Sequence, residues 1–516
     1  MQKRILLIVL LCVGWLVGAQ EFPVDYTFGE KYNDRYKYSN LLTIEDDGQG
    51  GTLLVRAYYS GMIIKPKGFI IEHYDENLQL KSEYNYKLKG SEFVNGYFRN
   101  GQLYLLFLDY NYETEEYEYW VHRSPVDPFS FTKEKLLSFR SAPVKNPLDK
   151  NYYNRRFNSG FTTTVLFPED KSSFVISTHY KKGKNNRHDI YLFTSGLKQA
   201  LYQDFSSEVE EKNYAFERVA VSRDLDQVYI IGKAYFKKRR FTALERKFQY
   251  ELIKLNKSGI STQNFDSPGK YSESLTPILH KGDLICVGFY ANRKDNRYNG
   301  LSYFKVDPIS LQVKTSKYNP FSEQFMFDKF GQEYDKEIKN LVFKNVVVTT
   351  DNSILFNAEE YFVTQSVQAN SSGGRLRVER FHHNDIVSAK IDDQGNMVWA
   401  RNINKSEVTQ GDGSYASYSS LTKNGRTYFF ISTAAENPQL LNNERIIFKQ
   451  GLSRNRNVFV IQLDEQGKMS YEKIIDSKDA RLPLMVSNPL KNELKGKVLF
   501  YAKRGTKKQL VNVAID

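Results

Sequence analysis

The chain has 516 residues, with 73 Lys and Arg against 60 Asp and Glu, which gives a formal net charge of +13. A hydrophobic content of 41% excludes an intrinsically disordered chain, and a mean hydropathy of −0.55 excludes a multi-span membrane protein. Many Tyr (36) and Phe (35) residues beside only two Cys favour a large all-β protein without a disulfide framework.

The first 19 residues have the features of a signal peptide. Lys3 and Arg4 precede an apolar run at residues 5–11, which continues weakly to Val17, and residues 17–19 suit the positions before a cleavage site. We expect cleavage before Gln20, with residues 20–516 forming a single β-propeller domain and no membrane span remaining. A buried strand or an uncleaved anchor is the alternative. Leu11 does not fit a lipobox before Cys12, so lipidation is not expected.

An apolar alternating strand that follows a polar turn recurs eight times along the chain. Its copies lie at residues 52–59, 103–108, 173–177, 228–232, 283–290, 353–356, 426–432 and 497–501. Most copies are followed by a hairpin, and the clearest hairpins have D-x-x-G turns at residues 392–395 and 464–467. In such a turn the Asp side chain bonds back to the backbone, and Gly takes the positive φ.

These repeats predict a single β-propeller of four-stranded antiparallel blades. We count eight blades, or seven if one unit is an insertion. The units span residues 39–86, 91–138, 160–204, 216–265, 274–317, 341–402, 418–475 and 484–515. The last unit shows only three strands, so residues 22–28 are expected to supply the fourth and close the ring.

Positive charge concentrates in the loops that join the second and third strands of each unit. Their summed charge exceeds the +13 of the whole chain. Three adjacent units form what we call the basic arc, made of Lys181, Lys182, Lys184 and Arg187, then Lys237, Lys238, Arg239, Arg240, Arg246 and Lys247, then Arg293, Lys294 and Arg297. The arc is the candidate ligand-binding site, for an anionic glycan, lipopolysaccharide or an acidic partner protein. Simple solvation of the loops is the alternative, and nucleic acid is not expected.

Other residues that could carry chemistry have simpler interpretations. The apolar strand around Cys286 predicts a buried, unreactive thiol. Helix is expected within residues 321–341 and 438–447. His382 and His383 are adjacent on a strand, so they point to opposite faces and should not share a metal. Glu359 and Glu360 could serve a glycosidase as a carboxylate pair. We find no hydrolase, zinc or phosphate-loop motif, so neither a metal nor a cofactor is expected, and the catalytic residues of any enzyme stay unknown.

Residues 384–401 carry a family resemblance. They resemble the secreted β-propeller repeat of Bacteroidota envelope proteins, whose hairpin pattern is D-I/V-x-V-A-K-L-D-x-x-G-x-x-x-W. Residues 458–469 are a weaker copy that lacks the Trp. The resemblance implies a propeller in the bacterial envelope and brings no catalytic motif with it.

Two functions are therefore kept. The first is an exported, non-catalytic propeller that binds a partner protein or an anionic glycan through its basic loops. The second is an envelope polysaccharide lyase or glycoside hydrolase acting on an acidic glycan. A His/Tyr/Arg/carboxylate group converging at the basic face would favour the enzyme. The expected location is the periplasm or cell envelope, with secretion as the alternative.

Overall fold

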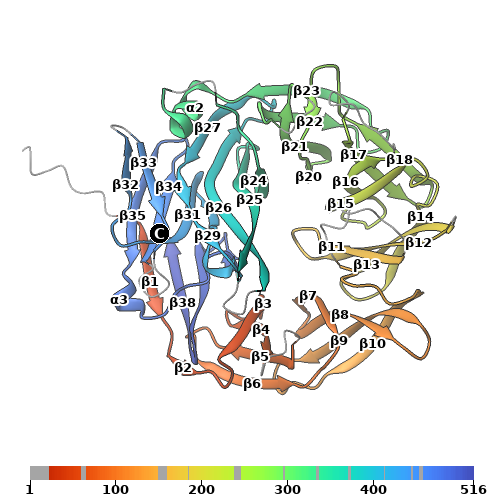
Figure 1. Ribbon diagram of the computed structural model, residues 1–516, viewed down its shortest axis with the longest axis horizontal. Coiled ribbons are helices and arrows are strands. Elements are labelled where there is room, and N and C mark those ends of the chain that lie inside the picture. Colours follow the sequence, from red (N-terminus) through yellow and green to blue (C-terminus); the bar gives the residue numbers. More distant parts are fainter. Residues whose placement is uncertain are drawn as a thin grey trace, which may run out of the picture.

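The computed structural model describes residues 22–59, 66–148, 160–183, 185–237, 246–293, 297–332, 336–369, 374–411, 413–442, 445–451 and 457–515. The predicted signal peptide lies outside these residues. Eight antiparallel sheets of four or five strands stand around a central channel (Figure 1). Within the described residues the chain is thus an eight-bladed β-propeller, as the repeats predict.

The first four sheets follow one another in chain order, and each runs from an innermost first strand to an outermost fourth. Their strands are β3 (Tyr38–Asp46), β4 (Thr52–Tyr59), β5 (Gly68–Tyr74) and β6 (Leu80–Tyr86); β7 (Glu92–Arg99), β8 (Gln102–Asn111), β9 (Glu116–Pro125) and β10 (Thr132–Arg140); β11 (Gly160–Leu166), β12 (Ser173–Lys182), β13 (Asn185–Thr194) and β14 (Gln199–Asp204); β15 (Lys212–Val221), β16 (Val228–Phe236), β17 (Phe248–Asn256) and β18 (Gly259–Asn264).

Of the next three sheets, the fifth and sixth each have one added strand, whereas the seventh keeps four. Their strands are β19 (Tyr271–Ser272) and β20 (Thr276–His280), β21 (Asp283–Ala291), β22 (Gly300–Val306) and β23 (Val313–Pro320); β24 (Leu341–Val348), β25 (Ile354–Ala369), β26 (Arg375–Ile391) and β27 (Met397–Ile403), with β29 (Val408–Thr409) beside β26; β30 (Ser419–Lys423), β31 (Arg426–Thr433), β34 (Asn457–Leu463) and β35 (Met469–Ile475).

The eighth sheet closes the ring with both ends of the described chain. β36 (Leu490–Asn492), β37 (Lys497–Arg504) and β38 (Lys507–Ile515) are completed by β1 (Val24–Phe28), which pairs antiparallel with β38 from Val24 opposite Ile515 to Phe28 opposite Val511. β2 (Tyr32–Asn33) also pairs with β38. The prediction that residues 22–28 supply the missing strand is confirmed.

The apolar core lies between neighbouring sheets. Eight buried clusters occupy the eight interfaces of the ring, each drawing on two adjacent sheets. Along β4, Leu53 and Val55 pack against the second sheet, whereas Leu54 packs against the eighth. Successive side chains of a strand point to opposite faces, so a strand buried on both faces is continuously apolar. This is why the second strands are the strongest signal in the sequence.

The predicted turn chemistry is present at both D-x-x-G hairpins. The Asp392 carboxylate accepts hydrogen bonds from the backbone N–H groups of Gln394 (3.0 Å) and Asn396 (2.7 Å), and Gly395 has φ of 84°. Asp464 accepts from its own turn in the same way, and Gly467 has φ of 78°. Both turns therefore adopt the conformation that their sequences predict.

One of the two helix predictions is confirmed and the other is wrong. α2 (Glu323–Phe330) begins after Ser322, whose hydroxyl accepts from the Phe325 N–H, and packs against β27. Residues 438–447 instead hold β32 (Gln439–Asn442) and the start of β33 (Arg445–Lys449). The β-branched residues Ile446 and Ile447 pair antiparallel with Leu440 and Gln439 of β32, and β33 continues in parallel pairing with β28 (Lys405–Ser406) at Phe448 and Lys449. A short helix, α3 (Ser477–Ala480), and a 3-10 turn at Gly413–Tyr415 are the other elements of the described residues.

The alternation of strands divides the surface into two ends. We call the end with the second-to-third strand loops and the connections between sheets the loop face. The opposite end, with the first-to-second and third-to-fourth strand turns, is the turn face. No helix among the described residues has the length and apolar character needed to cross a membrane.

Candidate ligand pocket in the central channel

The innermost strands share an irregularity that shapes the channel. Four of them shift their pairing register by one residue near the start of the strand. The shifts lie between Leu41 and Thr43 in β3, Phe93 and Asn95 in β7, Phe216 and Arg218 in β15, and Phe343 and Asn345 in β24. A β-bulge leaves one residue unpaired and re-aims its side chain. Leu42 and Lys344, the extra residues of β3 and β24, both line the main channel cavity.

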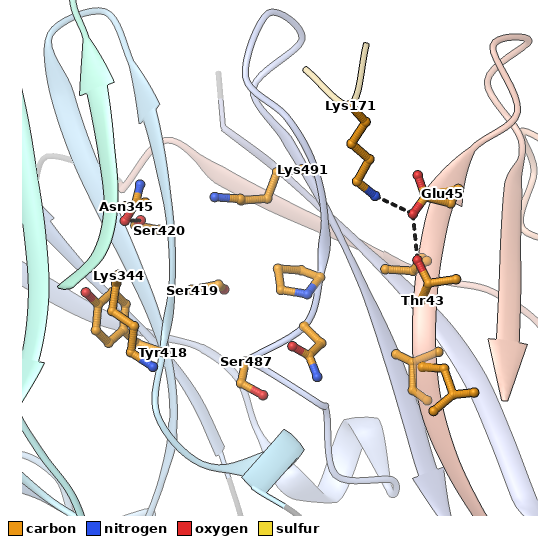
Figure 2. A pocket seen from close by; sticks show the side chains of 15 residues that line it. Thr43, Glu45, Lys171, Lys344, Asn345, Tyr418, Ser419, Ser420, Ser487 and Lys491 are labelled. Atoms are coloured by element: carbon orange, nitrogen blue, oxygen red, sulfur yellow. Dashed lines mark hydrogen bonds and ion pairs between the residues drawn. The ribbon is translucent and has the colours of Figure 1, made fainter. Parts of the chain in front are cut away.

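This cavity, the channel pocket, has a volume of about 330 Å³. Its wall comes mainly from the innermost strands of four consecutive sheets, the sixth, seventh, eighth and first, and from the segments just before β30 and β36. Figure 2 shows Lys171 reaching in from the β11–β12 turn of the third sheet toward Glu45 on β3. The pocket is thus assembled from segments that lie far apart in the sequence.

Two of the pocket's ammonium groups are held by carboxylates. Lys171 Nζ lies 2.6 Å from Glu45 Oε1, which also accepts a hydrogen bond from the Thr43 hydroxyl at 2.6 Å. Lys344 Nζ lies 2.9 Å from Glu359 Oε2 behind the wall. These charges offset one another inside the protein, so the pocket is polar with little uncompensated charge at these two positions.

Hydroxyl and amide groups form the rest of the polar lining. The Ser420 hydroxyl donates to Asn345 Oδ1 at 3.2 Å, and that of Ser487 donates to the backbone carbonyl of Ser414 at 3.0 Å. The Ser419 side chain is buried, and its oxygen has no hydrogen-bond partner among the described residues. A buried hydroxyl without a partner is costly, so Ser419 offers a ligand or a water a hydrogen bond that the protein does not use.

Glu359 is the buried acid behind this wall. Its Oε2 accepts from the Ser417 hydroxyl at 2.8 Å and lies 3.5 Å from His383 Nδ1, while Oε1 lies 3.5 Å from Lys405 Nζ. Burial alone would raise the pKa of Glu359, but His383 and the two lysines, Lys405 and Lys344, lower it to about 2. The carboxyl is therefore ionised at neutral pH and does not suit general-acid work.

The neighbouring Glu360 does not join Glu359. It pairs with Lys329 of α2 at 2.9 Å, so the two carboxylates point to opposite sides of β25. The structure therefore does not bring together the carboxylate pair that the sequence allows for a glycosidase. Cys286 is buried as expected, and burial raises the pKa of its thiol.

The structure describes eight of the thirteen residues of the basic arc. Lys184, Lys238, Arg239, Arg240 and Lys294 lie outside the described residues. Among the others, Arg246 is an internal residue rather than a surface cation. Its guanidinium lies 2.8 Å from Glu273 and 3.3 Å from Asp266, and it stacks on Phe248 with 4.6 Å to the ring centroid.

Three further arc residues have partners on the loop face. Arg187 pairs with Asp189 at 2.6 Å, and Arg297 pairs with Glu337. Lys237 donates to the carbonyls of Val209 and Glu210, the second at 3.1 Å. Burial, together with the nearby Lys181, lowers the pKa of Lys237. The third and fourth sheets therefore do bring Lys181 and Lys237 close together.

Exposed cations of the arc remain on each of its three sheets. Lys182, Lys247 and Arg293 are exposed, and Lys181 is partly exposed. Two aromatic side chains near the arc are engaged elsewhere: Tyr290 is buried under Lys270, and Tyr298 donates to the Leu341 carbonyl at 3.3 Å.

Sequence reasoning missed the channel pocket. Its polar residues come from several first strands, and each is an unremarkable Ser, Asn, Thr or Lys in its own segment. The one usable signal is the break in apolar alternation at the bulges, such as Lys344 inside the run Leu341–Val348.

Comparisons with known proteins bear on the fold alone. No protein-family model matches the chain, and no curated protein matches it. Similar solved structures include the β-propeller domain of the Trilobed protease from Pyrococcus furiosus, at 8% identity and a TM-score of 0.35, covering 87% of this chain and 98% of that one. Polysaccharide lyase Uly1 matches at 8% identity and a TM-score of 0.36, and the match covers 95% of this chain and 100% of the lyase. Prolyl oligopeptidase B from Galerina marginata matches at 10% identity and a TM-score of 0.36. This match covers 93% of this chain but only 56% of the oligopeptidase chain.

Proposed function

We propose that this protein is an exported, non-catalytic β-propeller that binds a glycan, with one sugar residue in the channel pocket. The observation that carries the proposal is the pocket itself. Its volume of about 330 Å³ lies at the lower end of small-molecule sites and suits one or two sugar rings. Export rests on the predicted signal peptide, and an envelope location rests on the resemblance of residues 384–401.

The chemistry of the lining supports a sugar. Ser419, Ser420 and Asn345 offer the hydroxyl and amide groups that pair with sugar hydroxyls, which both donate and accept hydrogen bonds. Leu41 and Leu42 supply apolar surface for the C–H face of a ring. The Lys171–Glu45 pair is already satisfied, so a neutral sugar residue beside it leaves neither of these two charges unpaired.

We expect Ser419→Ala and Asn345→Ala each to weaken glycan binding about fivefold, the effect of losing one hydrogen bond. The screen uses an array of neutral and acidic oligosaccharides with the chain from Gln20, followed by calorimetry on the best binder. Ser261→Ala, on the exposed strand β18, is the matched control and should bind as the unchanged protein does. Binding of no glycan, or equal affinity in all variants, would refute the proposal.

The enzyme alternative keeps one specific observation in its favour. The rings of Tyr361 and His383 lie 5.1 Å apart, and His383 is next to Glu359, near the wall of the channel pocket. A lyase acting on an acidic glycan needs a base at such a place. Incubation with an oligo-uronate should then produce a new ultraviolet-absorbing double bond, and His383→Ala should abolish it. If the protein binds a glycan but forms no such double bond, the enzyme alternative is refuted and the binding function stands.

A further inference from the structure

A second hollow lies on the turn face, opposite the basic arc. It has a volume of about 940 Å³ and is bordered by turns of the second to fifth sheets. The β11–β12 turn separates it from the channel pocket, because Lys171 points into the pocket whereas Asp170 and Ser172 line the hollow. The two spaces are therefore neighbours with different walls.

Three cations from three different sheets line this hollow. Arg99 ends β7, Arg223 lies in the β15–β16 turn, and Lys281 lies at the tip of the β20–β21 turn. All three are exposed. The Lys281–Gly282 turn has φ of 50° and 85°, the two positive values of a tight hairpin, which hold the lysine at the turn's tip.

These cations have no carboxylate partner among the ion pairs of the described residues. Arg99 instead donates to the Ser195 hydroxyl and, at 3.4 Å, to the Ser172 carbonyl, which fixes its position at the rim. Lys281 Nζ donates to Asn352 Oδ1 at 2.7 Å. The carboxylate in the lining, Asp170, accepts from the N–H and hydroxyl of Ser172 within its own turn.

On the loop face, three arginines, Arg187, Arg246 and Arg297, have carboxylate partners, whereas Lys182, Lys247 and Arg293 are exposed cations like those of the hollow. An unpaired cation at the edge of a concavity attracts an anion more strongly than one already neutralised by a neighbour, because its field is not cancelled and the concave wall focuses it. The turn-face hollow thus combines concave shape with uncompensated positive charge.

We propose that the turn-face hollow binds an oligoanion, through Arg99, Arg223 and Lys281, at a site separate from the channel pocket. The three cations come from separate sheets, and the hollow has nearly three times the volume of the channel pocket. A single small anion would engage one or two of them. A ligand with at least two carboxylate or phosphate groups, spaced along a short chain, can engage all three.

The test compares two triple variants that remove the same charge from opposite faces. Calorimetry uses trigalacturonate as a carboxylate probe, inorganic tripolyphosphate as a phosphate probe and maltotriose as the neutral control, at low and moderate salt. Arg99→Gln, Arg223→Gln and Lys281→Gln together should weaken binding of at least one anionic probe tenfold or more and reduce its salt dependence. Lys182→Gln, Lys247→Gln and Arg293→Gln together should leave it within twofold.

The outcomes separate the alternatives. Which probe binds identifies the source of the anionic groups. Loss of binding only in the loop-face variant would place the binding site at the basic arc and overturn the proposal. Equal losses in both variants, or no binding of either probe, would also overturn it. Because Arg99 also contacts Ser195, the double variant Arg223→Gln/Lys281→Gln serves if the triple variant is unstable. Ser419→Ala should not change oligoanion binding, so the proposal for the turn-face hollow and the proposal for the channel pocket are tested independently.

Discussion

Glu72→Gln is expected to destabilise the protein by about 3–5 kcal/mol, the usual cost of removing one partner from a buried ion pair. Glu72 is fully buried on β5, where its two oxygens accept hydrogen bonds from Nε (3.0 Å) and Nη2 (2.9 Å) of Arg56. Lys508 on β38 also pairs with Glu72. Burial alone would raise the pKa of Glu72, but Arg56 and Lys508 hold it below its ordinary value.

This buried network joins the first and eighth sheets where the ring closes. Arg56 also pairs with Asp34 at 2.6 Å, in the segment that follows β2, and Asp34 pairs with Lys503 at the end of β37. Removing one negative charge from its centre leaves the buried Arg56 with Asp34 and the buried Lys508 with the partly exposed Glu83 as their remaining counter-charges. The loss should therefore fall on the interface that holds the two ends of the chain together.

Urea denaturation measures the effect, with Glu83→Gln as the matched control. Glu83 pairs with the same Lys508 at 2.8 Å, but its side chain is 37% exposed, so water replaces part of what is lost. We expect the control to cost less than about 1 kcal/mol. Equal destabilisation by the two substitutions would show that the network does not carry ring closure.

Local chemistry explains which parts of the fold can be predicted from the sequence. The D-x-x-G turns at Asp392 and Asp464 need only their own residues, and the second strands of the sheets are apolar throughout because both faces are buried. The closing strand could be predicted because the last unit lacks a fourth strand. The helix expected at residues 438–447 is wrong because Gln439 and Leu440 pair with Ile447 and Ile446 in a local hairpin, whose second strand continues beside the distant β28.

Contacts over long sequence separations explain what could not be predicted. Arg56 lies in an apolar strand, and no nearby residue in the sequence indicates that Lys503 and Lys508 lie beside its carboxylate partners. Arg246 belongs to a basic run, yet Glu273 and Asp266 neutralise it from other segments. The sequence shows where the cations lie along the chain, whereas their availability to a ligand depends on which carboxylates the fold places beside them.

Acidification from pH 6.5 is expected to destabilise the protein through its buried histidines. Burial lowers the pKa values of His122 and His179 to about 4, and that of His188 well below its ordinary value. In the unfolded chain each titrates near its usual value of about 6.5. Between about pH 6.5 and pH 4 the unfolded chain therefore binds more protons than the folded one, so stability falls as pH falls.

The expected slope is about 1.4 kcal/mol per pH unit for each histidine, or on the order of 3 kcal/mol each over the whole window. His122 and His188 have polar partners that a glutamine amide can also engage: the Tyr86 hydroxyl lies 2.9 Å from His122 Nδ1, and the Ser177 hydroxyl lies 2.7 Å from His188 Nε2. His122→Gln and His188→Gln should therefore fold, although each changes the packing of its site.

The slope of stability against pH, rather than stability itself, tests the origin of the effect. Urea midpoints measured from pH 7 to pH 5 should fall less steeply in each single variant than in the unchanged protein, and least steeply in the double variant. Carboxylates such as Glu359, with a pKa of about 2, lose their contribution only below about pH 4.5 and do not interfere in this range. Parallel slopes in all four proteins would mean that the buried histidines are not the source of acid sensitivity, and that the loss begins with other groups.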